Sequence, residues 1–229
     1  MSATVRVISI GICAGMLALI GLIWTLSQTL GNLHEELYQG QPLSHWQEQL
    51  NGGDVAASNA ALAVVNAVVI PRLVDEMFHD TNDSQLRLDL IGTLNGLPGV
   101  EIAYVEADRR RAVAAYFLGE LGPVAAATVP SLIEVLKGPD VMVHESAIEA
   151  LGKIHSDPDD VIPLLIKCLD DRNFDDEAAR ALSYYGSLAK AAEPKIIRLL
   201  RVGDRDDQLT AQEALKKIDP EAAAKAGIK

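Results

Sequence analysis

The sequence predicts an all-α fold, a right-handed superhelix of stacked helical hairpins preceded by one transmembrane helix. Two patterns predict it. A long uncharged apolar run lies near the N-terminus, and a leucine and a proline recur at fixed spacing through the C-terminal half. Hydrophobic residues make up 49% of the chain but aromatic residues only 4%. The core must therefore be aliphatic, which suits helices packed side by side.

The apolar run at residues 7–26 is uncharged and long enough to cross a bilayer as one helix. A cleaved signal peptide is the alternative, but its apolar region is usually shorter, and the residues after this run form a poor cleavage signal. We therefore predict an uncleaved signal anchor over residues 1–30. Arg6 precedes the run, whereas Glu35 and Glu36 follow it. The positive-inside rule then places the helical domain on the extracytoplasmic (periplasmic) side.

The repeat is defined by a leucine that recurs at spacings of 33, 31 and 33 residues, followed in the first three copies by a proline twelve residues later. The leucines are Leu118, Leu151, Leu182 and Leu215, and the prolines are Pro130, Pro163 and Pro194. Each proline leads an apolar pattern typical of the second helix of a hairpin, with the proline in its first turn. One hairpin cannot cover its own apolar stripe, so we expect a stack of about five.

These patterns divide the chain into five segments. They are the anchor at 1–30, a juxtamembrane segment with a short helix at 31–53, irregular repeats at 54–107, regular repeats at 108–219 that end in a half repeat, and a tail at 220–229. A second apolar run at 60–70 contains Asn66 and is too short to span a membrane, so it predicts a core helix.

The sequence Ala150-Leu151-Gly152-Lys153-Ile154, together with the proline-led second helices, resembles HEAT repeats. The likeness is to the short, alanine-rich bacterial type related to phycobilisome-lyase-like modules. It implies a helical solenoid, and it implies a function less strongly because this repeat serves many purposes. A membrane-anchored scaffold for protein–protein interaction is the function we expect. The alternative is a HEAT-like bilin lyase or another ligand-handling enzyme.

Charge and motif content argue against several other functions. The net charge of −12 disfavours nucleic-acid binding. Cys13 lies in the apolar run and Cys168 in an amphipathic helix, so both are expected to be small hydrophobic residues. The five histidines form no metal-ligand motif, and no nucleophile motif or phosphate loop occurs. We therefore expect no catalytic residue, no cofactor and no metal.

Acidic clusters are the most frequent polar feature of the C-terminal half. They occur at 157–160, 170–171, 175–177 and 206–207. None has the spacing of a calcium-binding loop. Nearly all fall where a helix is expected to begin, and carboxylates stabilise helix N-termini. We interpret them as helix caps.

Aligning the second helices predicts one basic surface on this acidic protein. Its candidate protein-binding residues are Lys167, Lys195, Arg198 and Arg201. Such a surface could bind an acidic segment of a protein partner. The alternative is a solvated helix face whose cations pair with nearby carboxylates such as Glu134, Glu193 or Asp204. The run Arg109–Arg111 opens another helix and is expected to be exposed.

Overall fold

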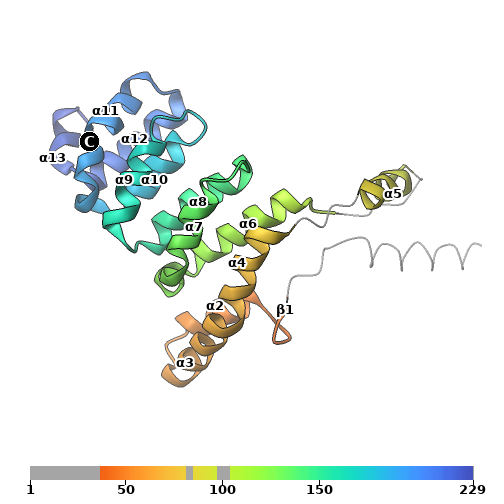
Figure 1. Cartoon of the computed structure of the whole chain (residues 1–229). Helices are drawn as coiled ribbons and strands as arrows, with labels where there is room; N and C mark the ends of the chain where they lie inside the picture. The colour runs from red at the N-terminus through yellow and green to blue at the C-terminus, as the bar shows by residue number, and fades with distance from the viewer. Residues whose placement is uncertain (1–36, 81–84, 97–103, 229) are drawn as a thin grey trace, which may run out of the picture. The chain divides into compact units, whose positions relative to one another are not determined.

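The computed structural model describes residues 37–80, 85–96 and 104–228, and these are mainly α-helical (Figure 1). The anchor predicted over residues 7–26 lies outside the described residues. The description that follows concerns one compact unit, residues 36–80 and 108–229. Helix α5 (Gln85–Asn95) belongs to a separate unit, in which Ile91 is buried.

A short β-hairpin, which the sequence did not predict, precedes the first helix. Strands β1 (Leu37–Tyr38) and β2 (Gln41–Pro42) pair in antiparallel fashion. Gln39 and Gly40 join them with φ angles of 54° and 79°, as a tight two-residue hairpin turn requires. Helix α2 (Leu43–Asn51) follows, and its Trp46 donates a hydrogen bond from Nε1 to the Tyr38 carbonyl oxygen at 3.0 Å. The hairpin is thereby fixed to α2.

The apolar run at 60–70 belongs to a longer helix than the sequence predicted. Helix α3 (Val55–Val64), the π-helical turn η1 (Val65–Val69) and helix α4 (Ile70–His79) are continuous. The π turn ends at Val69, two residues before Pro71. A proline ring clashes with the carbonyl four residues earlier and lacks an N–H, and the wider turn relieves this conflict.

This continuous helix, Val55–His79, is long and apolar enough by length and composition to cross a membrane. The same criteria are met by core helices of soluble proteins, so they are weak evidence for a span. Its side chains Ala61, Val65 and Val69 are fully buried at intervals of four residues, as in a helix that packs along one side. The core helix predicted at 60–70 therefore has one buried side, although much of its surface is exposed.

The C-terminal part consists of consecutive helical hairpins, which run from green to blue in Figure 1. The elements are α6 (Ala107–Glu120), η2 (Gly122–Thr128), α7 (Val129–Val135), α8 (Val141–Ile154), α9 (Pro158–Cys168), α10 (Asp175–Tyr184), η3 (Gly186–Ala192), α11 (Glu193–Val202), α12 (Arg205–Ile218) and α13 (Pro220–Lys225). The first helices of successive hairpins pack on one another, α10 lying against both α8 and α12. This C-terminal part of the chain is thus an α-helical solenoid.

The repeated leucines form the buried seam of this solenoid, as predicted. Leu118, Leu151, Leu182 and Leu215 are each 0% exposed. Beside them, a Cβ atom on Gly119 would lie 2.8 Å from the Ala150 Cα atom. The small residues of the Ala-Leu-Gly pattern therefore allow neighbouring first helices to approach closely.

The prolines do not all begin a second helix, which corrects the prediction. Pro130 and Pro194 lie in the first turn of α7 and α11. In both hairpins a 3₁₀ segment, η2 or η3, leads into the second helix. In the middle hairpin α9 begins earlier, at Pro158, and Pro163 lies inside it. Pro163 is exposed, so the helix tolerates the missing hydrogen bond on its solvent side.

The residues assigned to a C-terminal tail form a second helix as well. Helix α13 begins at Pro220 and buries Ala222 and Ala223 against the core. Asp219 caps its N-terminus by accepting hydrogen bonds from the N–H groups of Glu221 and Ala222. The last hairpin is therefore closed by a short helix.

The arginine run is less exposed than predicted. Arg109 is exposed, but Arg110 donates to both carboxylate oxygens of Asp80 at 2.6 and 2.8 Å. Arg111 donates to the Asp80 carbonyl oxygen and to Asp140, each at 2.5 Å. Successive residues of a helix point in different directions, and here two of the three face neighbouring helix ends.

Candidate functional site

The exposed side chains of α7, α9 and α11 form one surface, which we call the second-helix face. The four candidate residues lie on it, Lys167 in α9 and the other three in α11. Lys195 donates from Nζ to the Ile166 carbonyl oxygen at 2.8 Å and to Asp170 at 2.7 Å. Arg198 donates to the Leu169 carbonyl oxygen at 3.0 Å and to Asp170 at 3.3 Å. Both cations therefore cap the C-terminal end of α9.

Asp170 is the central residue of this arrangement, and the sequence analysis did not select it. A carboxylate at a helix C-terminus is unfavourable by itself, because the helix dipole is negative there. The hydrogen bond from Lys195, followed by the charges of Lys195 and Arg198, lowers the pKa of Asp170 below its ordinary value. The acidic pair at 170–171 therefore lies at a helix C-terminus, whereas the other clusters lie at the starts of α9, α10 and α12.

Lys167 and Arg201 differ from the two paired cations. Both are exposed, and neither forms an ion pair with any residue in the described ranges. The structure thus brings Lys195 and Arg198 together around Asp170, while Lys167 and Arg201 stay directed to solvent. The pairing partner predicted as Glu134, Glu193 or Asp204 is Asp170 instead.

A regularity of the repeat could have identified this partner. Lys195 and Arg198 follow Pro194 by one and four residues, and Asp170 follows Pro163 by seven. Neighbouring second helices are offset, so these positions meet across the junction between two repeats. The alignment contained this signal, but the offset between helices cannot be read from a single repeat.

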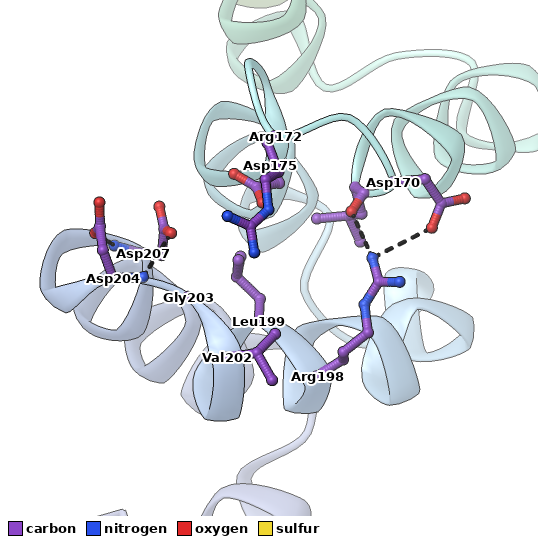
Figure 2. A pocket seen from close by; sticks show the side chains of 10 residues that line it. Asp170, Arg172, Asp175, Arg198, Leu199, Val202, Gly203, Asp204 and Asp207 are labelled. Carbon is purple, nitrogen blue, oxygen red and sulfur yellow. Dashed lines mark hydrogen bonds and ion pairs between the residues drawn. The ribbon is translucent and has the colours of Figure 1, made fainter.

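A cleft of about 500 Å³ lies next to this pair, between the ends of α9 and α11 and the start of α12 (Figure 2). Carboxylates and arginines line most of it. The lining residues are Leu169, Asp170, Arg172, Asp175, Arg198, Leu199, Val202, Gly203, Asp204 and Asp207. Figure 2 shows Arg198 beside Asp170 on one side and Asp204 with Asp207 on the other.

The acids of this cleft mainly serve the helices that carry them. Asp204 accepts hydrogen bonds from the N–H groups of Asp206 and Asp207, and the Asp207 carboxylate accepts from the Asp204 N–H at 2.8 Å. This reciprocal capping box begins α12. Burial and the nearby Asp207 carboxylate raise the pKa of Asp175. The cleft is polar, and its acids have structural partners.

A second cleft of about 490 Å³ lies between α7 and α9. Its lining combines aliphatic and charged side chains. The residues are Val129, Pro130, Ile133, Glu134, Lys137, Asp157, Asp160 and Leu164. It opens on the second-helix face, one repeat before the junction that Lys195 and Arg198 occupy.

The described residues offer little for cofactor or metal chemistry. No three His, Cys, Asp or Glu side chains among them are grouped so that they could hold a metal ion. Burial raises the pKa of the Cys168 thiol, which disfavours the reactive thiolate.

Comparison with known families agrees with the geometry of the hairpins. Residues 102–183 match the family model for HEAT repeats. The HEAT assignment applies to residues 102–183. No curated protein matches the chain at a significant level. The HEAT match spans α6 to α10, so it includes three of the four seam leucines, Leu118, Leu151 and Leu182, and the cleft between α7 and α9, but it ends before α11.

Proposed function

We propose that this HEAT-repeat protein is a non-catalytic scaffold that binds a protein partner through its second-helix face. The continuous seam of fully buried leucines carries the proposal, because it keeps successive hairpins in a fixed register. A rigid face loses little conformational freedom on binding. The two clefts between successive second helices are concave sites on this face that side chains of a partner could occupy.

The proposal also includes attachment to a membrane and the side of the membrane on which the helical domain lies. The uncharged run at residues 7–26 anchors the chain, and the helical domain lies on the extracytoplasmic side. Extraction and protease protection test this part. The chain should stay in the membrane pellet after an alkaline carbonate wash, and protease added outside the sealed membrane should digest the helical domain. Release by carbonate, or protection from external protease, would contradict it.

Partner binding is tested by photo-cross-linking in intact membranes. A photoreactive amino acid replaces Ser131, Lys167 or Arg201 on the second-helix face, and the matched controls carry it at Val113 or Glu213, exposed residues of first helices. We expect a discrete protein adduct from the second-helix positions and none from the controls. Absence of an adduct at all three second-helix positions would refute the proposed function.

The basic end of this face is proposed to contact an acidic segment of the partner. Lys167 and Arg201 carry this part, because Lys195 and Arg198 already bind Asp170. Reversing both charges, Lys167→Glu with Arg201→Glu, should lower adduct yield at Ser131 without lowering the melting temperature. Unchanged yield would remove the acidic segment from the proposal and leave the scaffold function standing.

A further inference from the structure

The junctions α9–α11 and α7–α9 are built from equivalent repeat positions but differ in chemistry. At the first, the residue after the proline is Lys195, and it binds Asp170 at 2.7 Å across the junction, beside the polar cleft of about 500 Å³. At the second, the equivalent residues are Leu164 and Lys137. A leucine and a lysine cannot form an ion pair. The cleft of about 490 Å³ lies at this second junction.

The floor of the cleft between α7 and α9 is aliphatic. Ile133 and Leu164 are half-buried, and Val129 beneath them is buried. A cleft of this size with an apolar floor can receive one or two apolar side chains of a partner. Burying them would remove apolar surface of both molecules from water, which favours association.

The rim of the cleft carries unpaired negative charge. Lys137 binds Glu134 at 2.5 Å, so these two charges balance. Asp157 and Asp160 are exposed, and neither side chain has an ion pair or hydrogen bond within the described residues. Asp157 is the N-cap residue of α9, Asp160 lies in the first turn of that helix, and both line the cleft.

We propose that this cleft binds a partner segment that carries an apolar side chain next to arginine or lysine. The apolar side chain occupies the floor over Ile133 and Leu164, and the cation pairs with Asp157 and Asp160. Charge complementarity selects a basic segment over an acidic one here, because the one lysine of the rim is already neutralised. The inference rests on the proposed scaffold function and specifies the chemistry of one of its contacts.

The test uses the full-length chain in detergent and three fluorescent peptides of equal length. One contains leucine between two arginine pairs, the second replaces the arginines with glutamate, and the third replaces the leucine with serine. Anisotropy at low and moderate salt measures their affinities. We expect the first peptide to bind at least about tenfold more tightly than either of the others, with weaker binding as salt rises.

The variant Asp157→Asn/Asp160→Asn should reduce affinity for the first peptide by about tenfold. The matched control is Asp159→Asn/Asp206→Asn, which changes the net charge of the protein by the same amount. Both residues are exposed and lie outside the cleft. It should alter affinity less than about twofold. Circular dichroism melting checks that every variant is folded.

Equal binding of basic and acidic peptides, or equal losses in the two double variants, would overturn the inference. If cross-linking from Ser131 captures a partner whose recovery is the same for Asp157→Asn/Asp160→Asn and the unmodified chain, this inference fails while the scaffold function remains. If cross-linking captures nothing, the scaffold function itself fails.

Discussion

The residue four positions after each of the first three repeated leucines ends the first helix in a left-handed conformation. Gly122 and Gly186 take this position with φ angles of 57° and 52°. His155 takes it in the middle repeat with a φ of 53°, although a non-glycine residue is disfavoured there. Its ring lies 4.8 Å from the Tyr185 ring, measured between centroids. This contact offsets part of the backbone strain.

The surroundings of Glu177 favour its protonated form. It lies in the first turn of α10, where an exposed acid would be stabilised by the helix dipole. Its Oε2 atom is instead buried without a hydrogen-bond partner. Burial and the neighbouring carboxylates of Asp176 and Glu145 raise the pKa of Glu177 to about 8.

This shift predicts a pH-dependent contribution to stability. The folded state holds a proton on Glu177 that the unfolded state releases near its ordinary pKa of 4.5. The stabilisation is therefore present below that pH and is lost as pH rises toward 8. Relative to Glu177→Gln, the unmodified chain should lose about 1–2 kcal/mol between pH 5 and pH 8, allowing for partial exposure.

Urea unfolding of both chains at these two pH values measures the effect. Glu213→Gln, at an exposed position of α12, is the control and should show no such difference. If the Glu177→Gln chain follows the same pH dependence as the unmodified chain, Glu177 does not hold the proton.

At the scale of elements, two arginines at the start of α6 bind the C-terminal end of α4 and the N-terminal end of α8. Arg110 and Asp80 have side-chain exposures of 15% and 14% and bind at the end of α4. Arg111 binds the Asp140 carboxylate, and Asp140 is the residue that precedes α8. A run of three arginines predicts solvent exposure in isolation, but the partners of two of them lie about 30 residues away. Sequence position alone could not reveal these pairs.

Arg110→Ala should therefore destabilise the protein strongly. It leaves the largely buried Asp80 without its bidentate partner, which costs about 2–3 kcal/mol. The matched control is Arg109→Ala, which removes the same charge from an exposed neighbour and should change the unfolding free energy by less than about 0.5 kcal/mol. Chemical denaturation compares the two, and equal losses would show that the Asp80 pair contributes nothing specific.

At the candidate site, too, the sequence predicted which residues are basic, and the tertiary contacts decided which of them are paired. The basic residues could be chosen from the repeat alignment, since Lys195 follows its proline by one residue, Lys167 and Arg198 by four, and Arg201 by seven. Whether each cation is available depends on the helix before it. Lys195 and Arg198 meet Asp170, but the same columns one repeat earlier leave a cleft with an acidic rim. That difference follows from the contacts between α7, α9 and α11.

At the scale of the whole molecule, stability depends on contacts between consecutive repeats. A Cβ atom on Gly152 would lie 2.6 Å from the Ala181 Cα atom and 2.8 Å from its Cβ atom. Neither helix can move away without opening the leucine seam beside it, where Leu151 and Leu182 are fully buried. In a solenoid each repeat contacts only its neighbours, so a defect at one junction weakens coupling along the array.

Gly152→Ala should therefore lower the unfolding free energy by about 1–3 kcal/mol through overpacking, although alanine favours helices more than glycine. Ser146→Ala in the same helix is the control, because it adds no atom at the junction. Hydrogen exchange should show faster exchange in α8 and α10 first. Higher stability of Gly152→Ala would mean that the two helices do not approach this closely.

The sequence by itself determined the helical class, the repeat and its buried leucines, because hydrophobic periodicity and turn residues act within one hairpin. It also suggested the residues of the basic surface. The tertiary structure decided the continuous helix Val55–His79, the pairing of Arg110 with Asp80, the capping of α9 by Lys195, and the open cleft between α7 and α9. The physical reason is that burial, ion pairing and cleft formation depend on how neighbouring helices are offset, and a linear pattern does not encode that offset.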